Sequence, residues 1–195
     1  MQPDFLSADY WNERYLAGQT GWDLGAVSTP LKAYFDQLED KHLAILIPGG
    51  GNSYEAEYLL QQGFDNITVV DISSVVTDKL KNKFLPYGDK IQVVCDDFFA
   101  LKGSYDLIIE QTFVSAIDPS LRGQCVETCF RLLKPNGKVT GVLFNKHFPE
   151  NPPFGGSIDE YHAMFSKRFH IKTLEECYNS IPPRMGTEVF FISQK

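Results

Sequence analysis

Three consecutive glycines and an acid downstream of them are the residues of this chain that are best spaced for chemistry. Gly49, Gly50 and Gly51 follow an apolar run, and Asp71 stands twenty residues after the last glycine, at the end of a second apolar run. Glycines let a backbone approach a ligand where a Cβ would collide. A carboxylate at this spacing can accept two hydrogen bonds from a ribose diol. The pattern predicts a nucleoside site, with a structural turn and an incidental acid as the alternative.

The residues around the glycines distinguish between nucleoside ligands. A dinucleotide fingerprint would place its third glycine at position 54, where the chain has Tyr54. A phosphate-binding loop would continue with Lys-Ser or Lys-Thr, whereas Asn52 and Ser53 follow the glycines here. A glycine loop with a ribose-binding acid and no pyrophosphate site favours S-adenosylmethionine. A nucleotide-dependent oxidoreductase is the disfavoured alternative.

Apolar runs typical of strands alternate with helical patterns along the chain. The expected strands are 43–47, 67–71, 91–95, 105–110, 138–144, 170–175 and 188–193, and the expected helices are 54–62, 75–84, 120–133 and 158–169. The first five strands are nearly continuous in apolar residues, as in a parallel sheet buried on both faces. No helical pattern separates the last two, so they should form an antiparallel hairpin. We therefore expect a doubly wound α/β fold with a seven-stranded sheet.

The carboxyl ends of the expected strands place polar residues along one rim, where ligands bind in such sheets. This rim carries Asp96, Asp97 and Phe98 after the third strand, and Glu110 and Gln111 after the fourth. Asp97 or the backbone at Phe98 is placed to meet an adenine amino group. The alternative for both aspartates is a solvated loop carboxylate or a helix cap.

The N-terminal segment is rich in aromatic residues. Both tryptophans of the chain, Trp11 and Trp22, lie in it, and Tyr15 shares one face of a short helix with Trp11. An aromatic face gains roughly 0.5–2 kcal/mol from a cation placed over it. We therefore expect an aromatic lid over a sulfonium, with a helix packed on the sheet edge as the alternative. The whole chain, 1–195, is expected to be one domain, with the lid and helices in 1–40 and the core in 41–195.

Composition narrows the classes of partner. The formal net charge is −7 and the chain has no basic run, which argues against nucleic acid or an anionic membrane as a partner. No run approaches the ~20 apolar residues of a spanning helix. The first residues lack the basic and apolar regions of a signal peptide. The cysteines and histidines have no metal-ligand spacing. We expect a cytoplasmic protein with a small-molecule substrate and no metal, either a monomer or a weak dimer.

Motifs along nearly the whole chain occur in a recognisable order. They lie at 11–25, where Trp-Asp-x-Gly precedes the glycine loop, and at 28–31, 47–51, 70–73, 97–99, 105–108, 113–119, 133–137 and 181–184. This order resembles the thiopurine S-methyltransferase superfamily, most closely its plant thiol, halide and thiocyanate methyltransferase branch. The resemblance implies a class I, Rossmann-like methyltransferase that uses S-adenosylmethionine. The implied cofactor-binding residues are Trp11, Tyr15, Trp22, Gly49, Gly50, Gly51, Asp71, Asp97, Phe98 and Gln111.

Three residues depart from the pattern of that family. Tyr15 stands where the plant branch tends to have a third tryptophan, and Gln111 replaces an aromatic residue or an arginine. Phe144 ends the fifth strand where a tyrosine is usual, so a hydroxyl is missing there. Because the last two lie near the expected acceptor, they bear on which substrate is methylated more than on the chemistry.

Methyl transfer from a sulfonium requires alignment and exclusion of water more than it requires a base. A neutral thiol, with a pKa of about 8.5, would gain from a nearby acceptor. The candidates are Asp23, Glu110 and, less favoured, His147. Asp23 could instead hold the lid, and Glu110 could anchor the cofactor ammonium. Arg184, behind two prolines, could attract an anionic substrate or form a salt bridge with Glu188.

The expected reaction is methyl transfer to a small soft nucleophile, either a thiol or an inorganic sulfur, halide or thiocyanate anion. A thiopurine, selenium or tellurium acceptor is the alternative within the same chemistry. A non-catalytic nucleoside-binding module is the alternative outside it. The loop at 148–157, with its prolines and paired glycines, is the expected second wall of the acceptor pocket.

Overall fold

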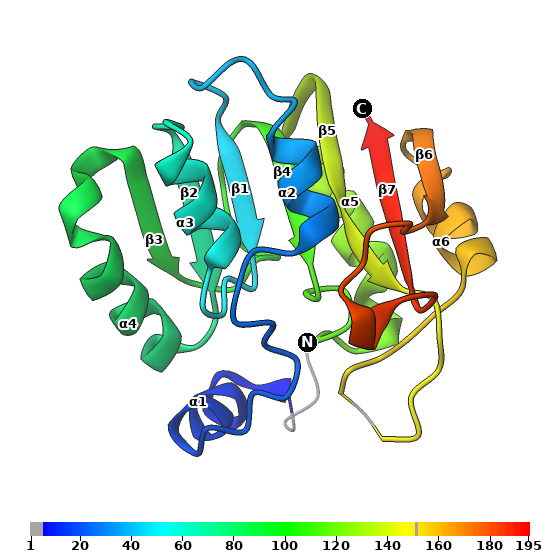
Figure 1. Ribbon diagram of the computed structural model, residues 1–195, viewed down its shortest axis with the longest axis horizontal. Coiled ribbons are helices and arrows are strands. Elements are labelled where there is room, and N and C mark those ends of the chain that lie inside the picture. The colour runs from blue at the N-terminus through cyan, green and yellow to red at the C-terminus, as the bar shows by residue number, and fades with distance from the viewer. Residues whose placement is uncertain (1–5, 151) are drawn as a thin grey trace.

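The computed structural model describes residues 6–150 and 152–195, which contain one seven-stranded sheet. Its strands are β1 (Ile45–Pro48), β2 (Ile67–Asp71), β3 (Ile91–Cys95), β4 (Tyr105–Gln111), β5 (Leu133–Phe144), β6 (His170–Glu176) and β7 (Glu188–Gln194). Their order across the sheet is β3-β2-β1-β4-β5-β7-β6 (Figure 1). Strands β3 to β5 pair in parallel, whereas β7 is antiparallel to both β5 and β6. The predicted doubly wound α/β fold with an antiparallel last strand is confirmed.

Helices cover both faces of the sheet. The helices of the described residues are α1 (Ala8–Leu16), α2 (Thr29–Phe35), α3 (Tyr54–Gln61), α4 (Ser74–Phe84), α5 (Arg122–Leu132) and α6 (Ile158–Phe165), with short 3-10 helices η2 (Leu85–Lys90), η3 (Pro119–Leu121) and η4 (Pro182–Arg184). The helices α2 to α6 lie on the two faces. One buried cluster, which includes Phe35 and Leu59, packs α2, α3 and α4 on the sheet. The other, which includes Cys129 and Tyr161, packs α5 and α6 on it. Burial on both faces explains why the central strands are apolar along their length.

Short polar residues fix where the helices begin. The Ser73 side chain accepts a hydrogen bond from the Val76 N–H at 3.2 Å, so α4 starts directly after β2. Ser157 and Glu160 form a capping box at the start of α6, as their spacing indicated. Both caps satisfy backbone donors that a helix start otherwise leaves unpaired.

Several boundaries differ from the sequence predictions, and three of the differences are instructive. The fifth helix begins at Arg122, because the preceding residues form η3, where the Asp118 side chain accepts from the Ser120 N–H. The strand β5 begins at Leu133 and shifts register against β4. The helix α6 ends at Phe165, although Phe169 is still buried in the core. The apolar pattern therefore continued past the end of the helix because Phe169 packs without being helical.

The N-terminal segment lies at the carboxyl ends of the parallel strands, where Figure 1 shows α1 below β1 and β2. Residues 1–5 of the predicted lid, and Asn151 in the predicted acceptor loop, lie outside the described residues. Within 6–150 and 152–195, no helix combines the length and the apolar character needed to cross a membrane.

Candidate active site

The glycine loop connects β1 to α3 in a conformation that side chains would disturb. Gly49 and Gly51 have positive φ angles of 61° and 51°. A Cβ on Gly49 would lie 2.6 Å from Cδ2 of Phe113, and a Cβ on Gly51 would lie 2.9 Å from the Tyr15 hydroxyl. The loop is therefore glycine both for its backbone angles and because two neighbouring elements approach it closely.

Asp71, at the end of β2, lies against this loop. Its Oδ2 accepts a hydrogen bond from the Gly51 N–H at 3.1 Å and its Oδ1 accepts from the Ser73 N–H at 2.9 Å. Burial raises the pKa of the Asp71 carboxyl, and these backbone donors oppose that rise. Because each carboxylate oxygen has two lone pairs, the side chain keeps acceptor capacity toward the pocket it lines.

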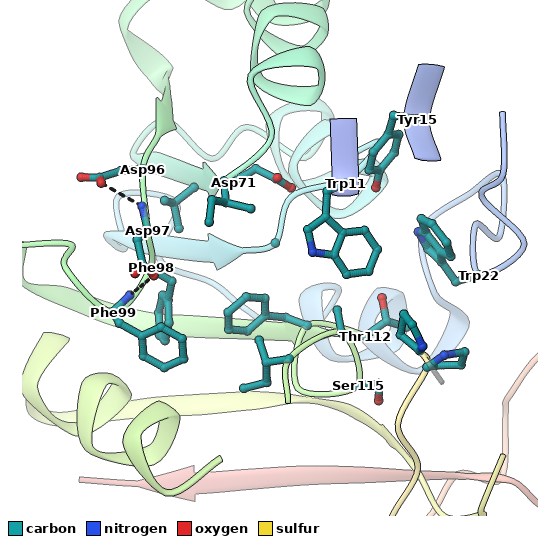
Figure 2. Close-up of a pocket in the computed structure, with 18 residues that line it drawn as sticks. Trp11, Tyr15, Trp22, Asp71, Asp96, Asp97, Phe98, Phe99, Thr112 and Ser115 are labelled. Carbon is teal, nitrogen blue, oxygen red and sulfur yellow. Dashed lines mark hydrogen bonds between the residues drawn. The ribbon is translucent and has the colours of Figure 1, made fainter. Parts of the chain in front are cut away.

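The main pocket lies between the glycine loop, the ends of β2 to β4 and the N-terminal segment (Figure 2). It is lined by Trp11, Tyr15, Trp22, Gly49, Val70, Asp71, Ile72, Asp96, Asp97, Phe98, Phe99, Thr112, Phe113, Ser115, Ala116, Ile117, Pro152 and Pro153. In Figure 2, Asp96 to Phe99 lie at one end, Trp22 lies at the other, and Trp11 lies between them. The structure thus brings the carboxylates that were predicted to bind a nucleoside next to a wall of aromatic rings.

Three aromatic rings from the N-terminal segment meet edge to face. The Trp22 ring centroid is 5.6 Å from that of Trp11 and 5.9 Å from that of Tyr15. Burial, with the nearby Asp71 carboxylate, raises the pKa of the Tyr15 hydroxyl, which stays protonated. Asn12 fixes this segment to the core, since its Oδ1 accepts from the Ser73 hydroxyl at 2.7 Å. The rings are in place for the predicted lid, whose opening and closing stays a prediction.

The two acids after β3 both line the main pocket. The Asp97 Oδ1 accepts from the Phe99 N–H at 2.9 Å, and the Asp96 Oδ1 accepts from the Asp97 N–H at 2.8 Å. Phe98 is buried and packs on Phe113 with ring centroids 5.1 Å apart. Each aspartate therefore has a local structural role and also lines the pocket.

A second hollow continues from the main pocket, with which it shares Tyr15, Trp22, Gly49 and Thr112. Its other lining residues are Asp23, Leu24, Ala26, Ile47, Gly50, Gly51, Asn52, Ser53, Tyr54, Glu55 and Gln111. The Asp23 carboxylate accepts from the Gly25 N–H at 2.7 Å and from the Asn52 side-chain amide. Gln111 holds its buried Oε1 with no hydrogen-bond partner among the described residues. This hollow joins the lid to the glycine loop.

Two of the proposed catalytic residues lie outside both hollows. Glu110 is buried, and its Oε1 accepts from the Val114 N–H at 3.0 Å. Arg184 pairs with Glu188 at 3.1 Å, the salt bridge that was its alternative role. His147 is exposed in the loop after β5 and also lines neither hollow. Among the candidates for a base, only Asp23 lines the cleft.

Several lining residues were not predicted as site residues. Thr112 has a φ of 64°, which is rare for a β-branched residue, and it lines both hollows. Phe113, Ala116 and Ile117 form an apolar wall after it. Their place directly after the fourth strand was the available signal, but the turn at Thr112 that folds them over the cleft has no mark in the sequence.

The charge of the lining is one-sided. Among the described residues, no lysine, arginine or histidine lines either hollow, whereas Asp23, Glu55, Asp71, Asp96 and Asp97 do. No group of three or more histidine, cysteine, aspartate or glutamate residues in the described part of the chain could hold a metal ion. The cleft therefore presents acids and aromatic rings, an arrangement suited to a cationic ligand with hydroxyl groups.

Comparison with known proteins gives a consistent result. The sequence profile of the thiopurine S-methyltransferase family matches residues 6–193. The chain is 27% identical to "Probable thiol methyltransferase 2" of Arabidopsis thaliana, over 93% of this chain and 83% of the relative. It is 25% identical to "Thiocyanate methyltransferase 1" of Brassica oleracea, over 95% and 84%. The crystal structure of 1,6-didemethyltoxoflavin-N1-methyltransferase from Burkholderia thailandensis, with bound S-adenosylhomocysteine, matches with a TM-score of 0.77 at 18% identity, covering 96% and 86% of the two chains.

Proposed function

The chain belongs to the thiopurine S-methyltransferase family of S-adenosylmethionine-dependent methyltransferases, and from this premise we propose that it methylates the sulfur of a small thiol. The observation that carries the proposal is a group of apolar, uncharged residues in the lining of the main pocket, which also contains Thr112 and Ser115. The group consists of Phe113, Ala116, Ile117, Pro152 and Pro153. We call these five residues the acceptor wall.

The residues of the cleft fit the cofactor. Asp71 has acceptor capacity left for a ribose diol, and Gly49 lines the main pocket with backbone alone. The orphaned Oε1 of Gln111 would gain a partner from a donor such as an ammonium group. When bound, S-adenosylmethionine supplies a methyl group on a positively charged sulfur.

The acceptor wall favours a sulfur atom carried on an apolar body. A strongly hydrated anion entering beside this wall would lose water without gaining a cationic side chain, and only the sulfonium of the cofactor would offset that cost. An alkyl or aryl thiolate meets the same sulfonium and in addition buries the apolar surface of its body, worth about 25 cal/mol for each Å² removed from water. The name of the Brassica relative makes thiocyanate the competing acceptor. Thiopurines react through the same sulfur chemistry and are compatible with this wall. Selenium and tellurium anions are disfavoured as acceptors for the same reason as other strongly hydrated anions.

The chain contributes alignment rather than proton transfer in the proposed reaction. Trp11 and Trp22 present aromatic rings to the cleft, which stabilise a cation and exclude water. The acceptor wall holds the sulfur in line with the methyl group, and holding reactants in line lowers the barrier by removing the entropy cost of their encounter. Because Asp23 is engaged by Gly25 and Asn52, we propose that the thiolate forms before it enters.

A radiolabelled methyl-transfer screen tests this proposal. The panel contains alkyl and aryl thiols, a thiopurine, thiocyanate, iodide, bisulfide and a selenium anion. We expect the highest kcat/KM with an apolar thiol. A higher value with thiocyanate would contradict the acceptor assignment. Binding of S-adenosylhomocysteine without turnover of any acceptor would instead support a binding module.

A pair of variants tests the role of charge at the same wall. Ala116 is partly exposed, so a longer side chain has room there. Ala116→Lys would add the missing cation and should lower KM for thiocyanate relative to that for a thiol. Ala116→Gln is the neutral control of similar length, and it should change both KM values alike.

A further inference from the structure

Arg184 makes a set of contacts that joins the end of the sheet to the N-terminal segment. Its Nη2 donates to the Trp22 carbonyl at 2.6 Å, and its Nη1 donates to the Glu188 Oε1 at 3.1 Å. The side chains of Arg184 and Glu188 are only 11% and 4% exposed. The guanidinium also lies over the Phe144 ring, 5.0 Å from its centroid. Arginine suits such a site because its planar fork can hold two acceptors at once.

The backbone around Arg184 holds this guanidinium in place. Arg184 ends the short helix η4, after two prolines that restrict its backbone. Its carbonyl accepts from the Thr187 N–H at 3.0 Å and from the Thr187 hydroxyl at 2.9 Å. Glu188 begins β7, where it pairs with Phe144 across the sheet. The guanidinium is thus anchored to β5 and β7, at the ends of these strands that lie nearest α1 (Figure 1).

The residue that Arg184 holds is the central ring of the aromatic cluster. Trp22 lines both hollows and meets Trp11 and Tyr15 edge to face. Figure 2 shows its ring at the end of the pocket opposite Asp96 to Phe99. A shift of the Trp22 backbone would therefore move a ring that lines both hollows and lies at one end of the main pocket.

The same contacts argue against Arg184 as a receptor for anionic substrates. Two of its donors are used within the protein, and it is absent from the lining of both hollows. Its charge is balanced by the buried Glu188 carboxylate, so an anion in the pocket would meet a neutral pair.

We propose that Arg184 is a positioning residue, which sets the aromatic wall of the cleft by holding the Trp22 carbonyl. The effect on catalysis rests on the proposed function, whereas the effect on Trp22 does not. The loss of Arg184 should therefore loosen the Trp22 ring in the free protein. It should also impair methylation of neutral and anionic acceptors alike.

Tryptophan fluorescence tests the first part without any activity. In a Trp11→Phe background, Trp22 is the only tryptophan of the chain. Adding Arg184→Met should shift its emission to longer wavelength and weaken its near-ultraviolet circular dichroism. Arg184→Lys, which has one donor group for two acceptors, should give an intermediate signal. Because Arg184→Met leaves the Glu188 charge unpaired, the double variant Arg184→Met/Glu188→Leu provides a form without that buried charge.

The matched control is Arg168→Met. Arg168 also pairs with a glutamate, Glu127 at 3.4 Å, and also lies over a ring, Phe130 at 4.1 Å, but it is remote from both hollows. This variant should leave the Trp22 signal unchanged. An unchanged Trp22 signal in Arg184→Met, Arg184→Lys and the double variant would overturn the proposal.

Kinetics and binding give the second readout. On the native aromatic background, Arg184→Met should weaken S-adenosylhomocysteine binding roughly tenfold, equivalent to the loss of about one net hydrogen bond. It should also lower kcat by a similar factor for a thiol and for thiocyanate. A rise in KM confined to thiocyanate, with the Trp22 signal unchanged, would show that Arg184 attracts anions instead. Failure of the native protein to bind S-adenosylhomocysteine would refute the proposed function and leave the fluorescence test of Arg184 decisive.

Discussion

Glu110 should make the stability of this protein depend on pH. Its carboxyl group is fully enclosed between β4 and α5, and burial raises its pKa from 4.5 to about 8, with Arg122 nearby opposing the rise. The unfolded chain releases this proton above pH 4.5, whereas the native protein keeps it until the pH approaches 8. The stability due to the protonated carboxyl is therefore complete below pH 4.5 and is lost as the pH rises through about 8.

The magnitude follows from proton linkage. Each pKa unit corresponds to about 1.4 kcal/mol, so the rise from 4.5 to about 8 corresponds to a loss of about 5 kcal/mol between acidic and alkaline pH. Glu110→Gln removes the titration and keeps an oxygen that can accept from the Val114 N–H. The variant should have the same free energy of unfolding as the native protein near pH 4.5. By pH 9 its free energy of unfolding should be higher than that of the native protein by up to about 5 kcal/mol.

Urea unfolding of both proteins from pH 4.5 to 9 measures this difference directly. Burial also raises the pKa of Asp71 and Glu55, but these groups are present in both proteins and cancel in the comparison. Glu127→Gln, at an exposed glutamate, is the control and should give no such gain. If the difference in the free energy of unfolding between the Glu110→Gln and native proteins stays constant with pH, the reasoning is refuted. Because Glu110 lies outside both hollows, kcat should change little in this variant.

Three further predictions concern the cleft. Asp71→Ala should weaken S-adenosylhomocysteine binding by roughly 2–3 kcal/mol in calorimetry, because it removes both of the ribose hydrogen bonds proposed for this carboxylate. Asp106→Ala, which also strips a backbone N–H of its acceptor but at the other end of the sheet, should not weaken it. Amides at 6–25 should exchange more slowly with S-adenosylhomocysteine bound and faster in Asn12→Ala, and equal protection with and without ligand would favour a static packed helix. The rate with thiols should follow the thiolate fraction across pH, whereas a bell-shaped profile with thiocyanate between about pH 6 and 9 would implicate a titrating protein group.

The fold could be predicted from the sequence because the patterns that indicate its strands and helices are local. Apolar runs located every strand, and the missing helical pattern before β7 predicted the antiparallel pairing that the sheet shows. The errors arose where tertiary contacts override the pattern. Phe169 continues the apolar spacing of α6 and is buried, yet the backbone has already left the helix.

The site residues could be predicted only in part, because the position of a residue along a strand is a local property and the direction of its side chain is not. The rim residues follow from strand ends, so Gly49, Asp71 and Asp97 could be placed at the cleft before any coordinates. The direction of a side chain at a strand end could not be placed. Glu110 and Gln111 are adjacent in sequence, but successive residues of a strand point to opposite faces, so Gln111 lines the second hollow while Glu110 faces α5.

The proposal that no side chain acts as a base and the lack of a cation in the described lining lead to the same mechanistic conclusion. If none of the lining carboxylates acts as a base, the nucleophile must arrive already ionised, but a lining without a cation cannot attract it by charge. The positive charge that draws the thiolate in must then come from the sulfonium of the cofactor. Binding should therefore be ordered, with S-adenosylmethionine entering first. Product inhibition by S-adenosylhomocysteine should be competitive with the cofactor and noncompetitive with the thiol. A thiol that binds the free enzyme as tightly as the cofactor-bound enzyme would show that the apolar acceptor wall alone is sufficient for acceptor binding.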